Sequence, residues 1–234
     1  TGAVSVTLAD NAGGTYTVTS DQAITVVNGT AATGDTITLA GIGTKTVTGL
    51  VANLSLDASN TGTTGVTTGA TALTITADAL AGNLTVDAAA LADNTALTLS
   101  GGANGKTATV NNLAGDLVAT GLVSALTVNL VDNAGDDDIS VTTGSHTTSI
   151  TGSISGDTVS VIATALADDA VLSTAGAGAF TITDLKGDLN NTATGAVSVT
   201  LADNAGGTYT VPEDQASTVL NGWAVTGAAL ARAG

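Results

Sequence analysis

The sequence has no cysteine and no methionine among its 234 residues. Without cysteine it can form neither a disulfide framework nor a thiolate metal site. Because even position 1 is not methionine, we expect the sequence to be a processed or excised piece of a longer chain. It has no run of about 18 apolar residues, so we expect no membrane insertion.

Aromatic residues are almost absent: they make up 2% of the chain, whereas hydrophobic residues in total make up 43%. A compact globule of this length usually buries several large aromatic side chains. The core must therefore be built from alanine, valine, leucine and isoleucine, and we expect it to be thin and long.

Basic residues are also scarce, since the chain has 4 Lys and Arg against 20 Asp and Glu, for a formal net charge of −16 at pH 7. A surface this acidic repels nucleic acids and anionic membranes, and it can hold cations. We therefore expect no nucleic-acid partner.

What the chain does contain is a long internal repeat. The stretch TGAVSVTLADNAGGTYTV at 1–18 returns unchanged at 194–211. This period divides the chain into one full long repeat, 1–193, and the start of the next, 194–234. Near-identical copies at a fixed spacing indicate a repeat architecture rather than an enzyme domain.

A shorter unit lies inside the long repeat. The segments TVTGLVANL, TVNNLAGDL and TITDLKGDL, at 46–54, 109–117 and 181–189, align without gaps. Their spacing gives a subrepeat of roughly 65 residues whose length varies by insertions. We call these three segments the subrepeat markers.

Stretches in which Val, Ile or Leu alternates with Thr or Ser, such as LTIT, FTIT and VSVTL, recur along the whole chain and are bounded by Gly, Asn, Asp or Ser. This pattern predicts an all-β fold of many short strands. The subrepeat is shorter than the roughly 100 residues of a typical β-sandwich, and residues 1–193 contain no tryptophan for a sandwich core. We therefore predict a parallel β-solenoid (β-helix).

Stacked coils suit small side chains, because valine then lies on valine and threonine on threonine at the strand spacing of about 4.8 Å. The spacing of the strands in the sequence is compatible with two coil sizes. A coil has roughly 22 residues if it contains two strands, or roughly 33 if it contains three.

The largest side chain lies near one end of the expected solenoid. Trp223 stands where the first copy has Thr30. Solenoids need atypical ends because their terminal strand edges are unpaired. We therefore interpret Trp223 as part of a terminal cap, with a plug between subunits or repeats as the alternative, and Tyr16 and Tyr209 are further candidate cap or interface residues.

Two motifs that resemble catalytic or nucleotide-binding sites lack the rest of their signature. SGGANGKT at 100–107 has Ser100 where a phosphate-binding loop needs glycine, and a strand pattern follows where a helix is required. His146, the only histidine, lies in the polar turn GSHTTS, and nothing in the sequence places it in a catalytic triad. We therefore expect the protein not to be an enzyme.

The acidic turns are the candidate metal sites. The turn DNAGDDD places Asp136, Asp137 and Asp138 side by side with Asn133 nearby. Oxygen ligands of this kind suit Ca²⁺, so these four residues are the predicted ligands and Ca²⁺ is the only candidate cofactor. The alternative is that Asp and Asn make hydrogen bonds to the backbone of their own turns.

Threonine is abundant, and the pattern Thr-x-Thr occurs at several places, among them 15–17, 74–76 and 208–210. Flat ladders of this pattern are how several ice-binding solenoids order water, which makes ice binding an alternative function. The irregular spacing of the pattern in the sequence argues against a flat array.

The whole chain resembles the repeat regions of giant bacterial secreted or cell-surface proteins, such as repetitive adhesins, S-layer-like proteins and extracellular matrix fibres. The resemblance rests on near-identical long repeats, on the LxDNAG and TVxxLxGDL units and on the Thr-, Ala-, Gly- and Asp-rich composition. It implies an extracellular location and a structural role.

We therefore predict an extracellular structural protein of the bacterial cell surface, a repeat scaffold that forms a stiff rod or filament for adhesion, a surface layer or a biofilm matrix. Its expected partner is itself, through head-to-tail repeats or subunits, and surface glycans are a further candidate partner. The alternatives are a calcium- or ice-binding solenoid module and a polysaccharide-acting β-helix enzyme.

Overall fold

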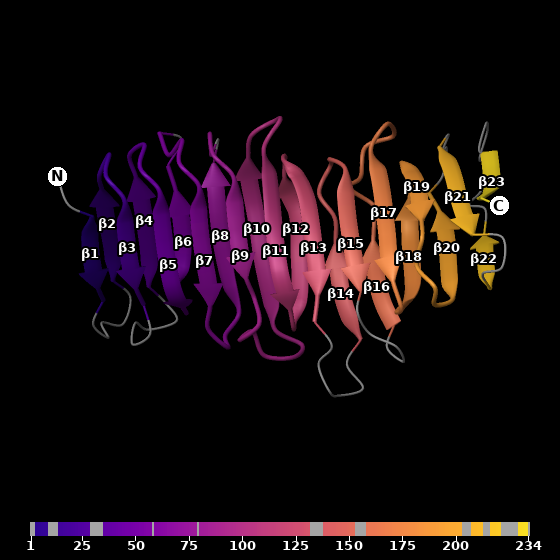
Figure 1. The fold of residues 1–234 in the computed structure, drawn as a ribbon, viewed down its shortest axis with the longest axis horizontal. Helices are drawn as coiled ribbons and strands as arrows, with labels where there is room; N and C mark the ends of the chain where they lie inside the picture. The colour runs from indigo at the N-terminus through magenta and orange to yellow at the C-terminus, as the bar shows by residue number, and fades with distance from the viewer. Residues whose placement is uncertain are drawn as a thin grey trace.

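The fold is an elongated stack of β-strands that lie across its long axis, with the two termini at opposite ends (Figure 1). The computed structural model describes residues 3–8, 14–28, 35–57, 59–78, 80–131, 138–152, 158–202, 207–212, 216–220 and 229–233, with the backbone alone at Leu220 and 229–233. These residues form 23 strands and no helix. The predicted all-β class is confirmed.

The strands form two parallel sheets, which we call the odd sheet and the even sheet after the strand numbers. The odd sheet has 12 strands: β1 (Val4–Thr7), β3 (Ile24–Val27), β5 (Lys45–Leu50), β7 (Thr64–Thr68), β9 (Leu84–Asp87), β11 (Thr107–Leu113), β13 (Ala125–Leu130), β15 (Thr148–Gly152), β17 (Val171–Gly176), β19 (Asp188–Asn191), β21 (Thr208–Pro212) and β23 (Ala229–Ala233). The even sheet has 11 strands: β2 (Thr15–Thr19), β4 (Thr36–Ala40), β6 (Asn53–Leu56), β8 (Leu73–Asp78), β10 (Ala96–Gly102), β12 (Asp116–Leu122), β14 (Ile139–Thr142), β16 (Thr158–Ile162), β18 (Ala179–Leu185), β20 (Val197–Leu201) and β22 (Ser217–Leu220).

Each strand bonds to the strand two places later in the chain, so every coil contributes one strand to each sheet. The chain is therefore a parallel β-solenoid, as predicted, and of the two coil sizes left open it has the smaller, two-stranded one. Coil length varies from 16 residues, between Leu185 and its register partner Leu201, to 24 residues, between Leu84 and Ala108. The turns absorb most of this variation, because the strands keep in register except at a few shifts.

The core is made of columns in which side chains of one kind stack along the axis. One column in the odd sheet runs through consecutive register pairs: Val6, Val26, Val47, Val66, Val86, Val110, Val128, Ile150, Thr174 and Asn191. Valine thus lies on valine, as the sequence predicts. At its far end the column becomes polar, and there the Thr174 hydroxyl donates a buried hydrogen bond of 2.6 Å to Asn191 Oδ1.

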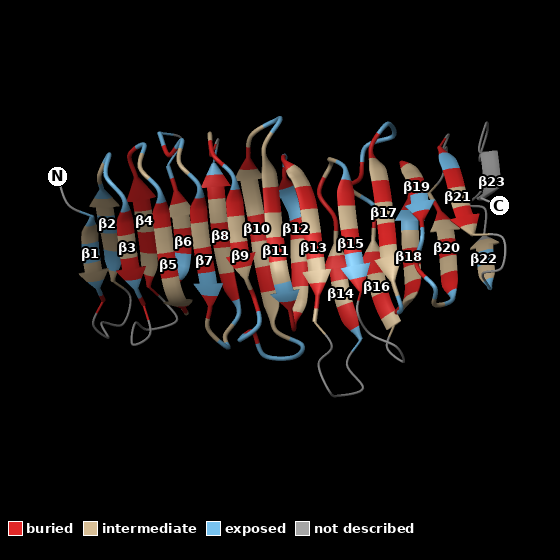
Figure 2. Ribbon diagram, in the orientation of Figure 1, coloured by how far each residue is buried: buried red, intermediate tan, exposed pale blue. Residues whose placement is uncertain are grey.

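Burial alternates along almost every strand, as the red and tan bands of Figure 2 show. The pattern in β13, for example, is alternately half-buried and buried over its whole length. Inward residues are mostly aliphatic and outward residues are mostly Thr and Ser, so the period-2 pattern of the sequence indicates which face of each strand points into the core. Burying each Val or Leu contributes about 1.5–3 kcal/mol, which makes the summed columns the main source of stability.

The subrepeat markers form sharp corners between the two sheets. In each marker the fourth residue has a positive φ: 65° at Gly49, 53° at Asn112 and 54° at Asp184. Glycine, asparagine and aspartate are the residues that adopt this conformation at least cost. The register of the strand shifts at the same point, which is a β-bulge.

The end of each marker ties its coil to the next one. The Oδ1 atoms of Asn53, Asp116 and Asp188 accept hydrogen bonds from backbone N–H groups one coil further on: Thr74 at 3.0 Å, Ser140 at 2.9 Å and Thr208 at 2.6 Å. We call these three residues the coil clamps. Each satisfies an amide at the start of a strand, where the ladder of the sheet has not yet begun.

The solenoid continues through the boundary of the long repeat. The turn that contains position 193 joins β19 to β20, and across it β18 pairs with β20 and β19 pairs with β21. No helix in the described part of the chain is long and apolar enough to cross a membrane.

Candidate functional site

The outer face of the odd sheet carries a continuous line of short polar side chains. Register pairs join its members from β1 to β21: Ser5, Thr25, Thr46, Gly65, Thr85, Thr109, Thr127, Ser149, Ser173, Asn190 and Thr210. We call this line the odd hydroxyl column. Neighbouring members are about 4.8 Å apart, and nine of the eleven bear a hydroxyl group, because only Gly65 and Asn190 differ.

The even sheet has a shorter line of the same kind, which we call the even hydroxyl column. Its members are Ser140, Ser160, Thr181, Ser198 and Thr218, again joined by consecutive register pairs. Both broad faces of the solenoid therefore present regularly spaced hydroxyl groups.

Charge is kept away from these faces. Among the side chains that the structure describes, charged groups lie in turns or within one residue of a strand end, as Asp78, Asp87 and Lys186 illustrate. The described acidic side chains are thus concentrated along the two rims where the chain turns. The broad faces are left neutral and the rims repel anions.

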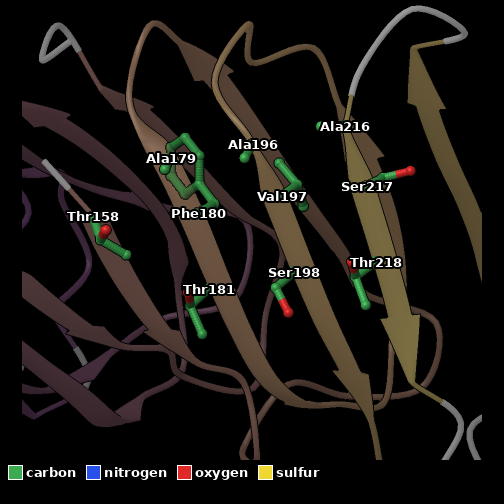
Figure 3. Close-up of a pocket in the computed structure, with 10 residues that line it drawn as sticks. All are labelled: Thr158, Ala179, Phe180, Thr181, Ala196, Val197, Ser198, Ala216, Ser217 and Thr218. Atoms are coloured by element: carbon green, nitrogen blue, oxygen red, sulfur yellow. The ribbon is translucent and has the colours of Figure 1, made fainter. Parts of the chain in front are cut away.

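A shallow hollow of about 340 Å³ lies on the even sheet over β16, β18, β20 and β22 (Figure 3). It is lined by Thr158, Ala179, Phe180, Thr181, Ala196, Val197, Ser198, Ala216, Ser217 and Thr218. None of these side chains is an acid or a base. The hollow can therefore receive a small neutral group, but its lining offers no proton-transfer chemistry.

A second hollow, of about 300 Å³, lies beside His146. His146 Nε2 is 2.6 Å from Asn104 Oδ1, and Nδ1 is 2.9 Å from Ser145 Oγ. Because an amide oxygen only accepts, Nε2 carries the proton and Nδ1 accepts from the Ser145 hydroxyl. The bonds join the β14–β15 turn to the β10–β11 turn, two coils earlier. His146 is thus part of a polar network that the sequence did not reveal, and its role there is to connect turns.

The side chain of Lys45 is completely buried, so its ammonium group lies inside the solenoid. Its Nζ donates to three backbone carbonyls, those of Ser20 at 3.1 Å, Gly41 at 3.1 Å and Gly43 at 2.7 Å. Burial lowers the pKa of Lys45, and the carboxylate of Asp21 partly offsets this. The three carbonyls form a cage of the kind that binds cations, and the ammonium group fills it.

Most of the predicted Ca²⁺ ligands lie outside the described residues: Asn133, Asp136 and Asp137 belong to the segment 132–137. Asp138 is described, and it is exposed directly before β14. Within the described ranges, no three or more His, Asp or Glu side chains are close enough to hold a metal ion. Calcium binding at 132–138 therefore stays a prediction.

Other acidic residues make the turn hydrogen bonds that were the alternative to metal binding. Asp57 Oδ1 accepts from the Ser59 backbone N–H at 2.8 Å, and Asp87 Oδ1 accepts from the Ala89 N–H at 3.3 Å. The hydrogen bonds from Ser59 lower the pKa of Asp57, because they stabilise its charged form.

The two tyrosines that were candidate cap or interface residues have different positions. Tyr209 is 2% exposed and lies in register between Leu189 and Leu230 inside the stack. Burial raises the pKa of its phenol. Tyr16 is half-buried in β2, the edge strand of the even sheet. Trp223, the principal cap candidate, lies outside the described residues.

Sequence reasoning missed the continuity of the odd hydroxyl column. The motifs looked irregularly spaced because the turns differ in length, but the register brings them into line. Thr109 and Thr127 are 18 residues apart, and Thr85 and Thr109 are 24 apart, yet both pairs are direct neighbours across the sheet. The column could have been found in the sequence by aligning the successive strands with one another, instead of measuring the spacing of the Thr-x-Thr motifs.

Comparison with known proteins gives no relative: no family model, no curated protein and no solved structure matches this chain.

Proposed function

We propose that the chain is a structural rod of the bacterial cell surface or extracellular matrix, built from tandem copies of the 193-residue repeat. One observation carries this proposal: both sheets continue through the boundary of the long repeat, where β18 pairs with β20, β19 pairs with β21, and Leu189 lies in register with the buried Tyr209. Since the strands of each coil pair only with strands of the neighbouring coils, copies can be added along the axis without disturbing those already present.

The distribution of charge and the composition agree with such a role. Acidic rims keep neighbouring rods soluble through repulsion, while neutral faces leave broad areas free for contact. The resemblance to repeat regions of giant surface proteins points to the same extracellular setting. In this function the hydroxyl columns of the broad faces provide the adhesive surface, and no catalytic group is required.

The proposal is tested by lengthening the chain. One or two extra copies of 1–193 are placed before Thr1; the junction then reproduces the natural sequence, because 194–211 is identical to 1–18. One copy, 1–193, has the 19 strands β1 to β19, or nine and a half coils, so each copy adds about 46 Å at constant width. Electron microscopy of the purified chains measures this length.

A linear increase in length with undiminished melting temperature supports the rod. Strings of separate particles joined by flexible segments, or chains that melt at a lower temperature with every added copy, would contradict it. A variant with Gly176→Ala in each copy is the control for rigidity, because a Cβ there would lie 1.6 Å from the Gly152 carbonyl oxygen and must disturb the stack.

The odd hydroxyl column favours a second candidate function, recognition of an ordered lattice such as ice. A column with one short polar side chain about every 4.8 Å along β1 to β21, free of charge, is suited to holding water molecules in a regular row. This column is a specific feature of the described residues that a plain scaffold does not need.

Freezing experiments separate the two functions. The variant Thr85→Lys with Thr127→Lys places charge within the column, and the matched control Ala89→Lys with Ala92→Lys places the same charge in an exposed turn. Lattice recognition predicts thermal hysteresis or inhibition of ice recrystallisation that the first variant loses and the second keeps. The absence of any effect of the unaltered chain on ice growth rejects this candidate and leaves the rod.

A further inference from the structure

The second copy of the long repeat begins in the opposite sheet. Strands β1–β4 and β20–β23 correspond one to one; β2, for example, is Thr15–Thr19, and β21 is Thr208–Pro212. Yet β2 belongs to the even sheet and β21 to the odd sheet, and the other three pairs are exchanged in the same way. Identical sequence thus faces opposite sides of the solenoid.

The exchange follows from an odd number of strands per long repeat. The first copy contains 19 strands, β1 to β19, so the second copy, which starts at β20, begins half a coil out of phase. The extra half coil lies between the second and third subrepeat markers. Six strands lie between the starts of β5 and β11, which carry the first two markers, whereas seven lie between β11 and β18, which carries the third.

Either sheet accepts the repeated segment because both offer the same kinds of neighbour. On the outer face Ser5 pairs with Thr25 in the odd sheet, and its equivalent Ser198 pairs with Thr181 and Thr218 in the even sheet. The inward neighbours are apolar in both places, since Val4 pairs with Ile24 and Val197 pairs with Phe180. The phase change therefore needs no adjustment of sequence.

We infer that consecutive copies in a tandem array present each equivalent surface alternately on opposite faces of the rod, so that the surface pattern repeats only every second copy. This inference rests on the proposed function, since it concerns copies joined in tandem. A rod of this kind is two-sided: whatever partner one copy takes on its odd sheet, the next copy takes on the other face. It is suited to bridging two surfaces or neighbouring rods instead of lying on one.

The half-coil phase is tested by disulfide cross-linking, because the chain has no native cysteine. Thr181→Cys with Ser198→Cys places two thiols in register on the even sheet, at a spacing that a disulfide can bridge. Asn190→Cys with Ser198→Cys is the matched control, because these residues belong to adjacent strands of opposite sheets. Mild oxidation should cross-link the first pair almost fully and the second hardly at all, and the reverse result overturns the inference.

The two-sided arrangement is tested by labelling pairs of introduced cysteines with biotin. Streptavidin is then bound to the biotin, and its position on the rod is seen by electron microscopy. Thr25→Cys with Thr218→Cys marks equivalent residues of the two copies, which should carry their labels on opposite sides. Thr25→Cys with Thr210→Cys marks two residues of the odd sheet, whose labels should lie on one side. Labels of the first pair on one side reject the inference even where lengthened chains form rods, so its failure is distinct from failure of the proposed function.

Discussion

Residues 1–18 and 194–211 share one sequence but differ in burial. Val197 is 2% exposed and Val199 is 1% exposed, whereas the equivalent Val4 and Val6 are only half-buried. The difference arises because β1 and β2 are edge strands, while β20 and β21 have a coil on each side. Burial in this molecule is therefore a property of the neighbouring coils and not of the segment itself.

The comparison shows where the stability of a solenoid resides. A coil gains most of its stabilisation at its interfaces, so an end coil, with one interface, has about half the gain of an internal coil. Equivalent substitutions in the two copies should consequently have unequal effects, and these differences can be measured within one molecule.

The largest difference is expected at the tyrosines. Tyr209→Ala removes a fully buried ring and should lower the free energy of unfolding by about 3–5 kcal/mol, whereas Tyr16→Ala should cost only about 1 kcal/mol. Denaturant unfolding, with hydrogen exchange to locate the loosened coils, measures both. Equal losses would mean that the end coil is packed as firmly as the interior, against the comparison.

A smaller effect is expected from Asp188, the coil clamp that ties the end of the first copy to Thr208 in the second. Asp188→Ala removes the acceptor of the Thr208 N–H and should cost about 1 kcal/mol, because that amide then loses its hydrogen bond. Asp188→Asn keeps a side-chain oxygen and should recover most of the loss. If the asparagine variant is as unstable as the alanine variant, charge rather than the hydrogen bond explains the clamp.

The burial of Tyr209 should also appear as a pH dependence. Its pKa is higher in the folded than in the unfolded chain, so the unfolded chain loses this proton first as the pH rises above about 10. The associated stability is complete below that pH and is lost as the pH rises through the folded pKa. Tyr209→Phe should abolish this part of the alkaline loss, measured by unfolding at pH 8–11.5, and Tyr16→Phe should retain it.

The smallest effect is expected on the outer faces. Thr17→Val and Thr210→Val replace equivalent outward hydroxyls and should each change the free energy of unfolding by no more than about 0.5 kcal/mol. Thermal melting of both variants checks this. A loss above 1 kcal/mol in either one would show that the outward residues support the stack and do not merely cover it.

The sequence predicted the architecture because its signals are local. Alternation fixed the strands, as in VSVTL at 197–201, and small side chains favoured columns over a rounded core. The subrepeat markers were also visible in the sequence, although the sequence alone did not show that they form the corners between the sheets. The series Gly49, Asn112 and Asp184 shares the ability to adopt positive φ, and that shared property identified the corner in retrospect.

The rest depends on counting strands across turns of variable length, which local patterns do not reveal. The exchange of sheets at 194 requires that exactly one extra strand lie between two markers, and the burial of Lys45 requires three carbonyls from two different turns to meet. The calcium ligands proposed at 132–138 mostly fall outside the described residues, so the structure does not decide them. Such features emerge only from long-range register.

The neighbour-only ladder has a mechanical consequence. A pull on the two ends of the chain loads the outermost coil first, and that coil can peel away while the next stays closed. Each event releases one coil of about 20 residues, or roughly 65 Å of extended thread. Under tension the molecule would therefore lengthen in small, similar steps as coils unfold one after another, and it would absorb mechanical work without breaking.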